Sequence, residues 1–164
     1  MKNILILMIV AFASLSLKGQ IVSANLQASG LTCSMCSNSI FKALKKLESV
    51  DEVESDVENS TFKIVFKSNE TVDLDALQKA VVGAGFSVAK MTFMLRTEAL
   101  DIKDRTLVEI GDKLFYFINT KDRTLKGEVE LRLLDKEFNS SKEYKKVKSK
   151  LYSDSEKRVF NVTI

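Results

Sequence analysis

The 164-residue chain contains no histidine, no proline and no tryptophan, and it has only two cysteines. Without histidine, Ser-His-Asp triads and the usual metallohydrolase centres cannot be built. The sequence also has no glycine-rich phosphate loop. Chemistry that needs a soft metal ligand or a thiolate is therefore confined to Cys33 and Cys36, and we expect a protein that is not an enzyme.

The composition is that of a globular protein, with 29% charged and 45% apolar residues. The formal net charge of +3 is too small to indicate a nucleic-acid partner.

Residues 1–24 have the pattern of a secretory signal peptide. Lys2 supplies the positive start, and an apolar run from Ile4 to Leu17 follows, which is shorter than the roughly 20 residues that a membrane span needs. Cleavage is expected near residues 20–24, after Gln20 or after Ala24. The sequence thus predicts a periplasmic or secreted protein with no stable membrane span after processing; the alternative is a retained membrane anchor.

The two cysteines lie between a predicted strand and a predicted helix. Before them, apolar residues alternate with polar ones, which is typical of a half-buried strand (Val22, Ala24, Leu26 and Ala28). After them, Ile40, Leu44 and Leu47 recur at helical spacing. We therefore expect Cys33 in the connecting loop and Cys36 in the first turn of the helix.

That placement favours a metal ion that binds few ligands. Unpaired N–H groups and the helix dipole stabilise a thiolate at a helix N-terminus and lower its pKa. Two thiolates converging at a surface loop suit Cu(I). A closed Zn(II) site takes about four ligands, so it would need carboxylates, an external thiol or a second molecule.

Residues 21–96 predict the order β-α-β-β-α-β, which is the ferredoxin-like α+β arrangement. Beyond the first strand and helix, the expected elements are a strand marked by Val53 and Val57, a strand over 62–66, a helix capped by Asp73, and a strand over about 86–95. Gly83 and Gly85 are expected to end the second helix.

The stretch Gly30-Leu31-Thr32-Cys33-Ser34-Met35-Cys36 resembles the metal-binding loop of heavy-metal-associated domains. That family includes Cu(I) chaperones, modules of copper-exporting ATPases and periplasmic mercury-binding proteins. The resemblance, placed at residues 25–96, implies Cys33 and Cys36 as ligands of Cu(I), with Hg(II) or Zn(II) as alternatives. It also implies a metal-transporting ATPase or another copper protein as partner. Leu31 and Phe86 stand where the family usually has Met and often has Tyr.

Residues 97–164 predict a small β-rich module with one helix, whose role the sequence does not indicate. A hairpin is expected around Gly111-Asp112, further strands around 128–133 and 160–164, and a helix over about 142–152 that begins at a Ser140/Glu143 capping box. This part has no Cys, Met or His, so it cannot supply a soft ligand. It could instead bind a protein or an envelope component.

Several alternatives remain open from the sequence alone. The two cysteines could form a redox-active pair or a structural disulfide, although the cis-proline and tryptophan of thioredoxin-like sites are missing. Met35 could be a third, weak ligand. Lys42, Lys45 and Lys46 could be a docking face or a solvated surface. The lysine-rich helix could contact a membrane, but its apolar stripe is expected to face the core.

Overall fold

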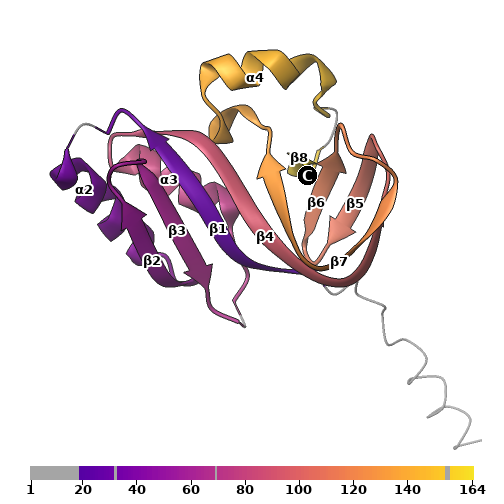
Figure 1. The fold of residues 1–164 in the computed structure, drawn as a ribbon, viewed down its shortest axis with the longest axis horizontal. Coiled ribbons are helices and arrows are strands. Elements are labelled where there is room, and N and C mark those ends of the chain that lie inside the picture. The colour runs from indigo at the N-terminus through magenta and orange to yellow at the C-terminus, as the bar shows by residue number, and fades with distance from the viewer. Residues whose placement is uncertain (1–18, 32, 69, 154–155) are drawn as a thin grey trace, which may run out of the picture.

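The computed structural model describes residues 19–31, 33–68, 70–153 and 156–164, so most of the predicted signal peptide lies outside the described residues. The described strands form one eight-stranded sheet in the order β2-β3-β1-β4-β7-β8-β6-β5 (Figure 1). The elements are β1 (Gly19–Ser29), α2 (Ser34–Lys45), β2 (Val50–Asp56), β3 (Thr61–Phe66), α3 (Leu74–Gly83), β4 (Ser87–Ile102), β5 (Thr106–Ile110), β6 (Lys113–Phe117), β7 (Arg123–Leu133), α4 (Ser141–Val147) and β8 (Val159–Thr163).

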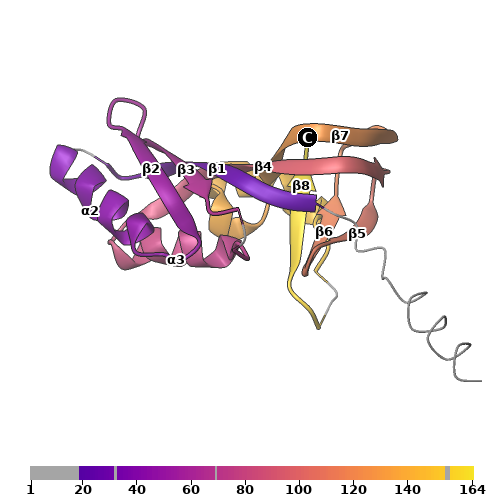
Figure 2. The ribbon, with the colours of Figure 1, turned by 90° about the horizontal axis from the view of Figure 1, so that it is seen from below.

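The N-terminal half has the predicted ferredoxin-like arrangement. β1 lies between β3 and β4 and is antiparallel to both, while β2 is the outer strand next to β3. α2 and α3 cover one face of these strands (Figure 2). Their apolar stripes are buried against the sheet, including Ile40, Leu44 and Leu77. Val57, which was expected in β2, lies instead in the turn that follows the strand and is exposed.

The ends of α3 follow the predicted local signals. The Asp73 carboxylate accepts a hydrogen bond from the Ala76 N–H at 3.1 Å, as an N-cap residue does. Gly85 has a φ of +93°, which a residue with a Cβ rarely adopts, and it lets the chain turn from α3 into β4.

β4 is longer than the sequence pattern predicts. It does not end near Leu95 but runs to Ile102, so the predicted boundary between residues 96 and 97 falls inside it. β4 pairs with β1 on one side and with β7 on the other, and a register shift between Thr97 and Leu100 bends it. One continuous strand therefore carries both halves of the molecule (Figure 1).

The C-terminal half is the predicted β-rich module with one α-helix. β5 and β6 form the expected hairpin, with Gly111 at a φ of +63°. β8 lies between β7 and β6, antiparallel to the first and parallel to the second. Aromatic rings fill this half of the core: Phe115 lies 5.6 Å from Phe93 and 5.7 Å from Phe160 between ring centroids.

The predicted helix over 142–152 is wrong in length and in packing. α4 ends at Val147 and a 3₁₀ turn covers Lys148–Lys150. No residue of α4 is buried, so its apolar stripe is not a core face. The N-cap prediction is confirmed in part, because the Ser140 hydroxyl accepts from the Glu143 N–H at 3.4 Å, while the Glu143 carboxylate bonds Lys146 instead.

In the described part of the chain, no helix combines the length and hydrophobicity needed to cross a bilayer.

Candidate metal centre

The loop that holds the two cysteines is set by the end of β1. Gly30 has a φ of +85°, which turns the chain away from the sheet. Leu31 is half-buried and packs against the core, as expected for the family's methionine position. A Cβ added to Gly30 would lie 3.9 Å from Cδ1 of Phe86, so the Phe86 ring lies beside the loop. Thr32 lies outside the described residues.

Cys33 and Cys36 converge at the start of α2. Cys33 is the N-cap residue, with extended backbone, and Cys36 lies in the first turn, as predicted. Their sulfurs are 2.7 Å apart without a disulfide bond between them. The Cys36 N–H points at the Cys33 sulfur over 3.4 Å. Cys33 is exposed and Cys36 is half-buried, so an incoming ion or thiol reaches the pair from solvent.

Hydrogen bonds stabilise a negative charge on the outer sulfur. The pKa of the Cys33 thiol lies below its ordinary value, first because the Cys36 side chain bonds it and then because the Cys36 N–H does. A thiolate is both the nucleophilic and the metal-binding form of cysteine, so this geometry prepares Cys33 for either role.

The remaining candidate ligand, Met35, lies between the two cysteines in the sequence. The Met35 side chain is 80% exposed, which fits the expectation that it faces solvent. Among the described residues, no group of three His, Cys, Asp or Glu side chains converges on one point. The site thus offers two thiols, and a tetrahedral ion would take its other ligands from outside this group.

The lysines of α2 do not form one uniform face. The Lys45 ammonium donates to the Asp51 carbonyl at 2.9 Å, which ties α2 to β2. Lys42 and Lys46 are exposed. The structure therefore gives Lys45 a structural contact and leaves the docking hypothesis for this face as a prediction.

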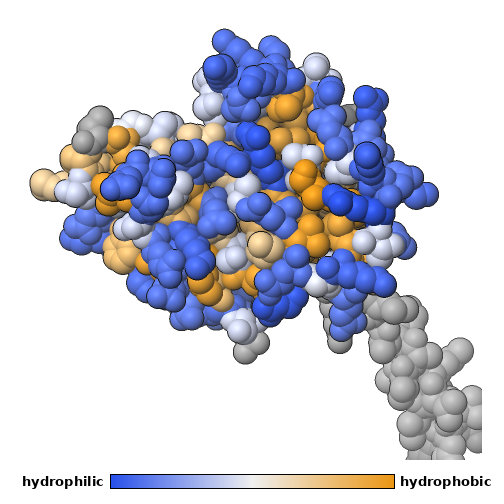
Figure 3. Space-filling view, viewed as in Figure 1, coloured by the Kyte–Doolittle hydropathy of each residue, from blue (hydrophilic) through white to orange (hydrophobic). Residues whose placement is uncertain are grey.

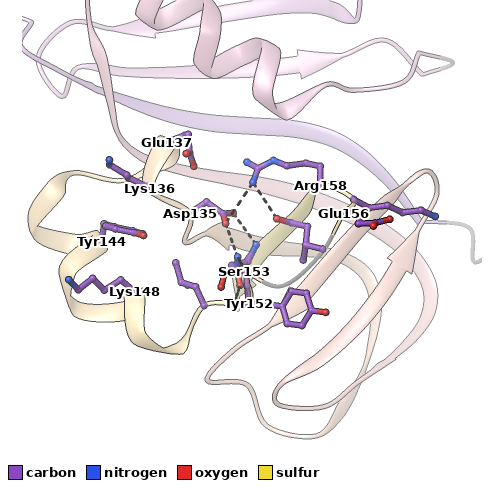
Figure 4. Close-up of a pocket in the computed structure, with 13 residues that line it drawn as sticks. Asp135, Lys136, Glu137, Tyr144, Lys148, Tyr152, Ser153, Glu156 and Arg158 are labelled. Atoms are coloured by element: carbon purple, nitrogen blue, oxygen red, sulfur yellow. Dashed lines mark hydrogen bonds and ion pairs between the residues drawn. The ribbon is translucent and has the colours of Figure 1, made fainter.

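The C-terminal half has its own cluster of charged groups, shown in Figure 4. It lines a cavity of about 600 Å³. Burial raises the pKa of Asp135, while hydrogen bonds from Asn161 and the charge of Arg158 act against that rise. The Asn161 amide donates to Asp135 at 2.7 Å, and the Asn161 N–H donates at 3.0 Å. Because these bonds satisfy the carboxylate, we assign the cluster a structural role.

Sequence reasoning missed Ser37, which follows Cys36 on α2. Ser37 is buried, and its hydroxyl has no hydrogen-bond partner among the described residues. A serine one position from a predicted ligand gives no pattern that would reveal this, because the burial depends on how α2 lies on the sheet.

With this geometry in view, residues 25–87 match the family model of the heavy-metal-associated domain. This part of the chain is a heavy-metal-associated domain. The match supports the predicted family and ends before β4 is complete.

Individual relatives each resemble less than half of the chain. The probable copper-transporting ATPase HMA5 of Arabidopsis thaliana is 31% identical over 77 residues, which are 47% of this chain but only 8% of the ATPase. MerP from Ralstonia metallidurans CH34 is 32% identical, covering 43% of this chain and 96% of its own, with a TM-score of 0.37. Apo-CopP from Helicobacter pylori is 27% identical, covering 41% and 98%, with a TM-score of 0.35.

Proposed function

We propose that this protein binds a soft metal ion, Cu(I) above all, between Cys33 and Cys36 and passes it on by ligand exchange. The observation that carries the proposal is the convergence of two thiols at the start of α2, with Cys33 open to solvent and Cys36 half-buried beside it. Thiolate ligands select Cu(I), and a two-coordinate ion leaves room for an incoming thiolate. The named role of the plant relative as a probable copper transporter supports copper as the cargo.

The test is an anaerobic Cu(I) titration of the reduced protein against a competing chelator. We expect one Cu(I) per chain, and we expect Cys33→Ser/Cys36→Ser to lose that site. A matched control is Ser34→Ala/Ser39→Ala, which changes two exposed neighbours in the same stretch. Equal binding by wild type and the cysteine variant would remove the proposal.

Met35→Leu separates two-coordinate binding from binding with a thioether. Because the Met35 side chain is exposed, we expect this variant to bind Cu(I) with unchanged affinity. A clear loss of affinity would mean that Met35 turns toward the metal when it is bound.

Hg(II) is the alternative cargo, since it also favours two thiolates, and Zn(II) is a further one. Direct competition among the three ions on the same reduced protein ranks them. Because two thiolates bind Hg(II) more tightly than Cu(I) in any protein, the metal content of the protein purified anaerobically from its own compartment decides the cargo, and Hg(II) found there would change the cargo but not the site.

The contact between the sulfurs also favours a second candidate function, thiol-disulfide exchange. Two thiols this close at a helix N-terminus can close into a disulfide once oxidised. Catalysis of insulin disulfide reduction by the wild type, absent in Cys33→Ser, would support an oxidoreductase.

We further propose that the protein is exported, to the periplasm or beyond, and that its partner is a metal-transporting ATPase or another copper protein. The charge and length of residues 2–17 support export. Cell fractionation combined with N-terminal sequencing tests this proposal: an uncut chain in the cytoplasm would contradict it.

A further inference from the structure

The net positive charge of the chain is concentrated around α4. Residues 141–150 contain five lysines and one glutamate, which gives them +4, so the other 154 residues together carry −1 of the chain's +3. The five are Lys142, Lys145, Lys146, Lys148 and Lys150. A single short segment therefore dominates the electrostatic field of an otherwise balanced molecule.

α4 contributes little to the hydrophobic core, so core packing does not explain why the chain has this helix. None of its residues is buried, and Tyr144 and Val147 on its inner side are only half-buried. Figure 1 shows α4 beyond the ends of the strands, at the top of the view, and Figure 3 shows it as a hydrophilic ridge with apolar atoms beneath it. A helix with this position is available to a partner.

A cleft of about 630 Å³ lies between α4 and the metal-loop end of the heavy-metal-associated domain. Ser29 and Ser87 line it on the domain's side, and Lys136, Lys145 and Lys148 line it on the side of α4. The hydroxyls of Ser29 and Ser87 are 3.1 Å apart and form a hydrogen bond between β1 and β4 at the bottom of the cleft. Ser29 precedes Cys33 by four residues, so the Cα atoms of these two residues are at most about 14 Å apart.

Three lysines of this cleft form no direct ion pair with a carboxylate of the described residues. Lys146 pairs with Glu143 at 2.6 Å. Lys136, Lys145 and Lys148, in contrast, have no ion-pair partner in the part of the chain that the structure describes. Glu137 is the one acidic residue of the cleft lining, so three free ammonium groups face one carboxylate. An acidic ligand would meet a net attraction here.

We propose that Lys136, Lys145 and Lys148, named here the lysine surface, dock the acidic face of a protein that exchanges metal with Cys33 and Cys36. This inference rests on the proposed function. A partner protein must bring its own thiolates to Cys33 to receive the metal. In that position, the part of the partner's surface next to its thiolates lies opposite the cleft. Opposite charges there steer the encounter and raise its rate, in some complexes by tenfold or more.

The probe is a synthetic acceptor peptide with four glutamates on each side of a Cys-Gly-Gly-Cys centre, and its twin has glutamines instead. Stopped-flow measurement follows Cu(I) transfer from the loaded full-length protein at low ionic strength. Copper stays Cu(I): the acceptor thiols release their protons as they bind it, and Cys33 and Cys36 take up the protons that they lost on loading.

Two protein variants with the same change of charge are compared on each peptide. Lys145→Glu/Lys148→Glu alters the lysine surface, while Lys121→Glu/Lys126→Glu alters exposed lysines near the far end of β4. We expect the first to slow transfer to the acidic peptide about tenfold and the second to leave it within about twofold. Lys145→Gln/Lys148→Gln provides the same test with a smaller change of charge, and it is therefore less disruptive to the folding of α4.

Several results would overturn the proposal. Equal slowing by both double variants would mean that only total charge matters, and no slowing by either would mean that the lysine surface is not used. Loss of binding to anionic phospholipid vesicles in Lys145→Glu/Lys148→Glu, with transfer unchanged, would assign the surface to a membrane. Salt-sensitive self-association lost in the same variant would assign it to a second copy. Failure of wild type to bind Cu(I) would instead overturn the proposed function.

Discussion

The Cys33 side chain caps the N-terminus of α2 and is also exposed to solvent. We predict that it is alkylated by iodoacetamide with a pH midpoint below the ordinary value for a cysteine. A lowered pKa means that the thiolate is already present at lower pH, so the rate rises earlier as pH increases. Peptide mapping by mass spectrometry across pH 5–10 measures the rate at this residue.

The comparison for this experiment is Cys36→Ala, because a serine hydroxyl at this position could still donate to the Cys33 sulfur. The Cys36 side chain is the largest cause of the lowered pKa, so its replacement moves the Cys33 midpoint upward, while the Cys36 N–H bond remains. A midpoint that stays where it was would show that the contact between sulfurs does not stabilise the thiolate.

Ser37 offers a prediction about stability. Its buried hydroxyl lacks a partner among the described residues, and such a group costs roughly 1–3 kcal/mol. We expect Ser37→Ala to raise the free energy of unfolding by about 1 kcal/mol in urea denaturation. Ser39→Ala, at an exposed position of the same helix, is the control and should change little. A marked loss of stability in Ser37→Ala would reveal a hydrogen bond that the hydroxyl makes in solution.

At this scale the sequence predicted where the two cysteines lie, at the start of α2, and their role as metal ligands stays a prediction. Cys33 and Cys36 were found because they are the only thiols in the chain and because the strand-to-helix change around them is local. The Asp135–Asn161 pair was not found, since its members are 26 positions apart and no spacing rule links them.

Among the elements, β1 gives the clearest prediction about stability, because its first residues pair with β4. Its first residues pair with β4 from Gly19↔Thr97 to Ala24↔Phe93, and Ile21 and Ala24 are buried. A chain that starts at Asn25 should be less stable than one that starts at Gly19 by about 3–5 kcal/mol, through lost burial and lost hydrogen bonds. Urea midpoints of the two proteins measure this. Equal midpoints would mean that cleavage after Ala24 is compatible with the fold.

β4 and α4 show where periodicity stops being informative. Beyond Leu95 the alternation of β4 is broken by Glu98 and Ala99, yet the strand continues because β7 pairs with it through a register shift. The stripe of α4 looked like a core face because periodicity reports amphipathicity, and it does not report whether anything packs against the apolar side.

β2 carries Asp51, Glu52, Glu54 and Asp56 and lies at the edge of the sheet. Its charge protects an edge whose N–H and C=O groups could otherwise pair with another chain.

For the molecule as a whole, Arg158 connects the two halves. Its guanidinium donates to both Asp75 oxygens, at 2.9 and 3.0 Å, and lies 4.4 Å from the centroid of the Phe160 ring. We predict a coupling of about 0.5–1 kcal/mol between Asp75 and Arg158, because solvent screens a pair that is 28% and 41% exposed.

A double-mutant cycle with Asp75→Ala and Arg158→Ala measures this coupling through the free energies of unfolding. Additive effects of the two changes would mean that the ion pair adds no coupling between the halves.

The position of β8 has a consequence for biosynthesis. The β5–β6 hairpin joins the described sheet through β8, which a ribosome makes after both of its neighbours. The hairpin has no place in the sheet until translation reaches residues 159–163, so the order of synthesis differs from the order of assembly. A nascent chain therefore keeps its C-terminal half open until β8 has been made.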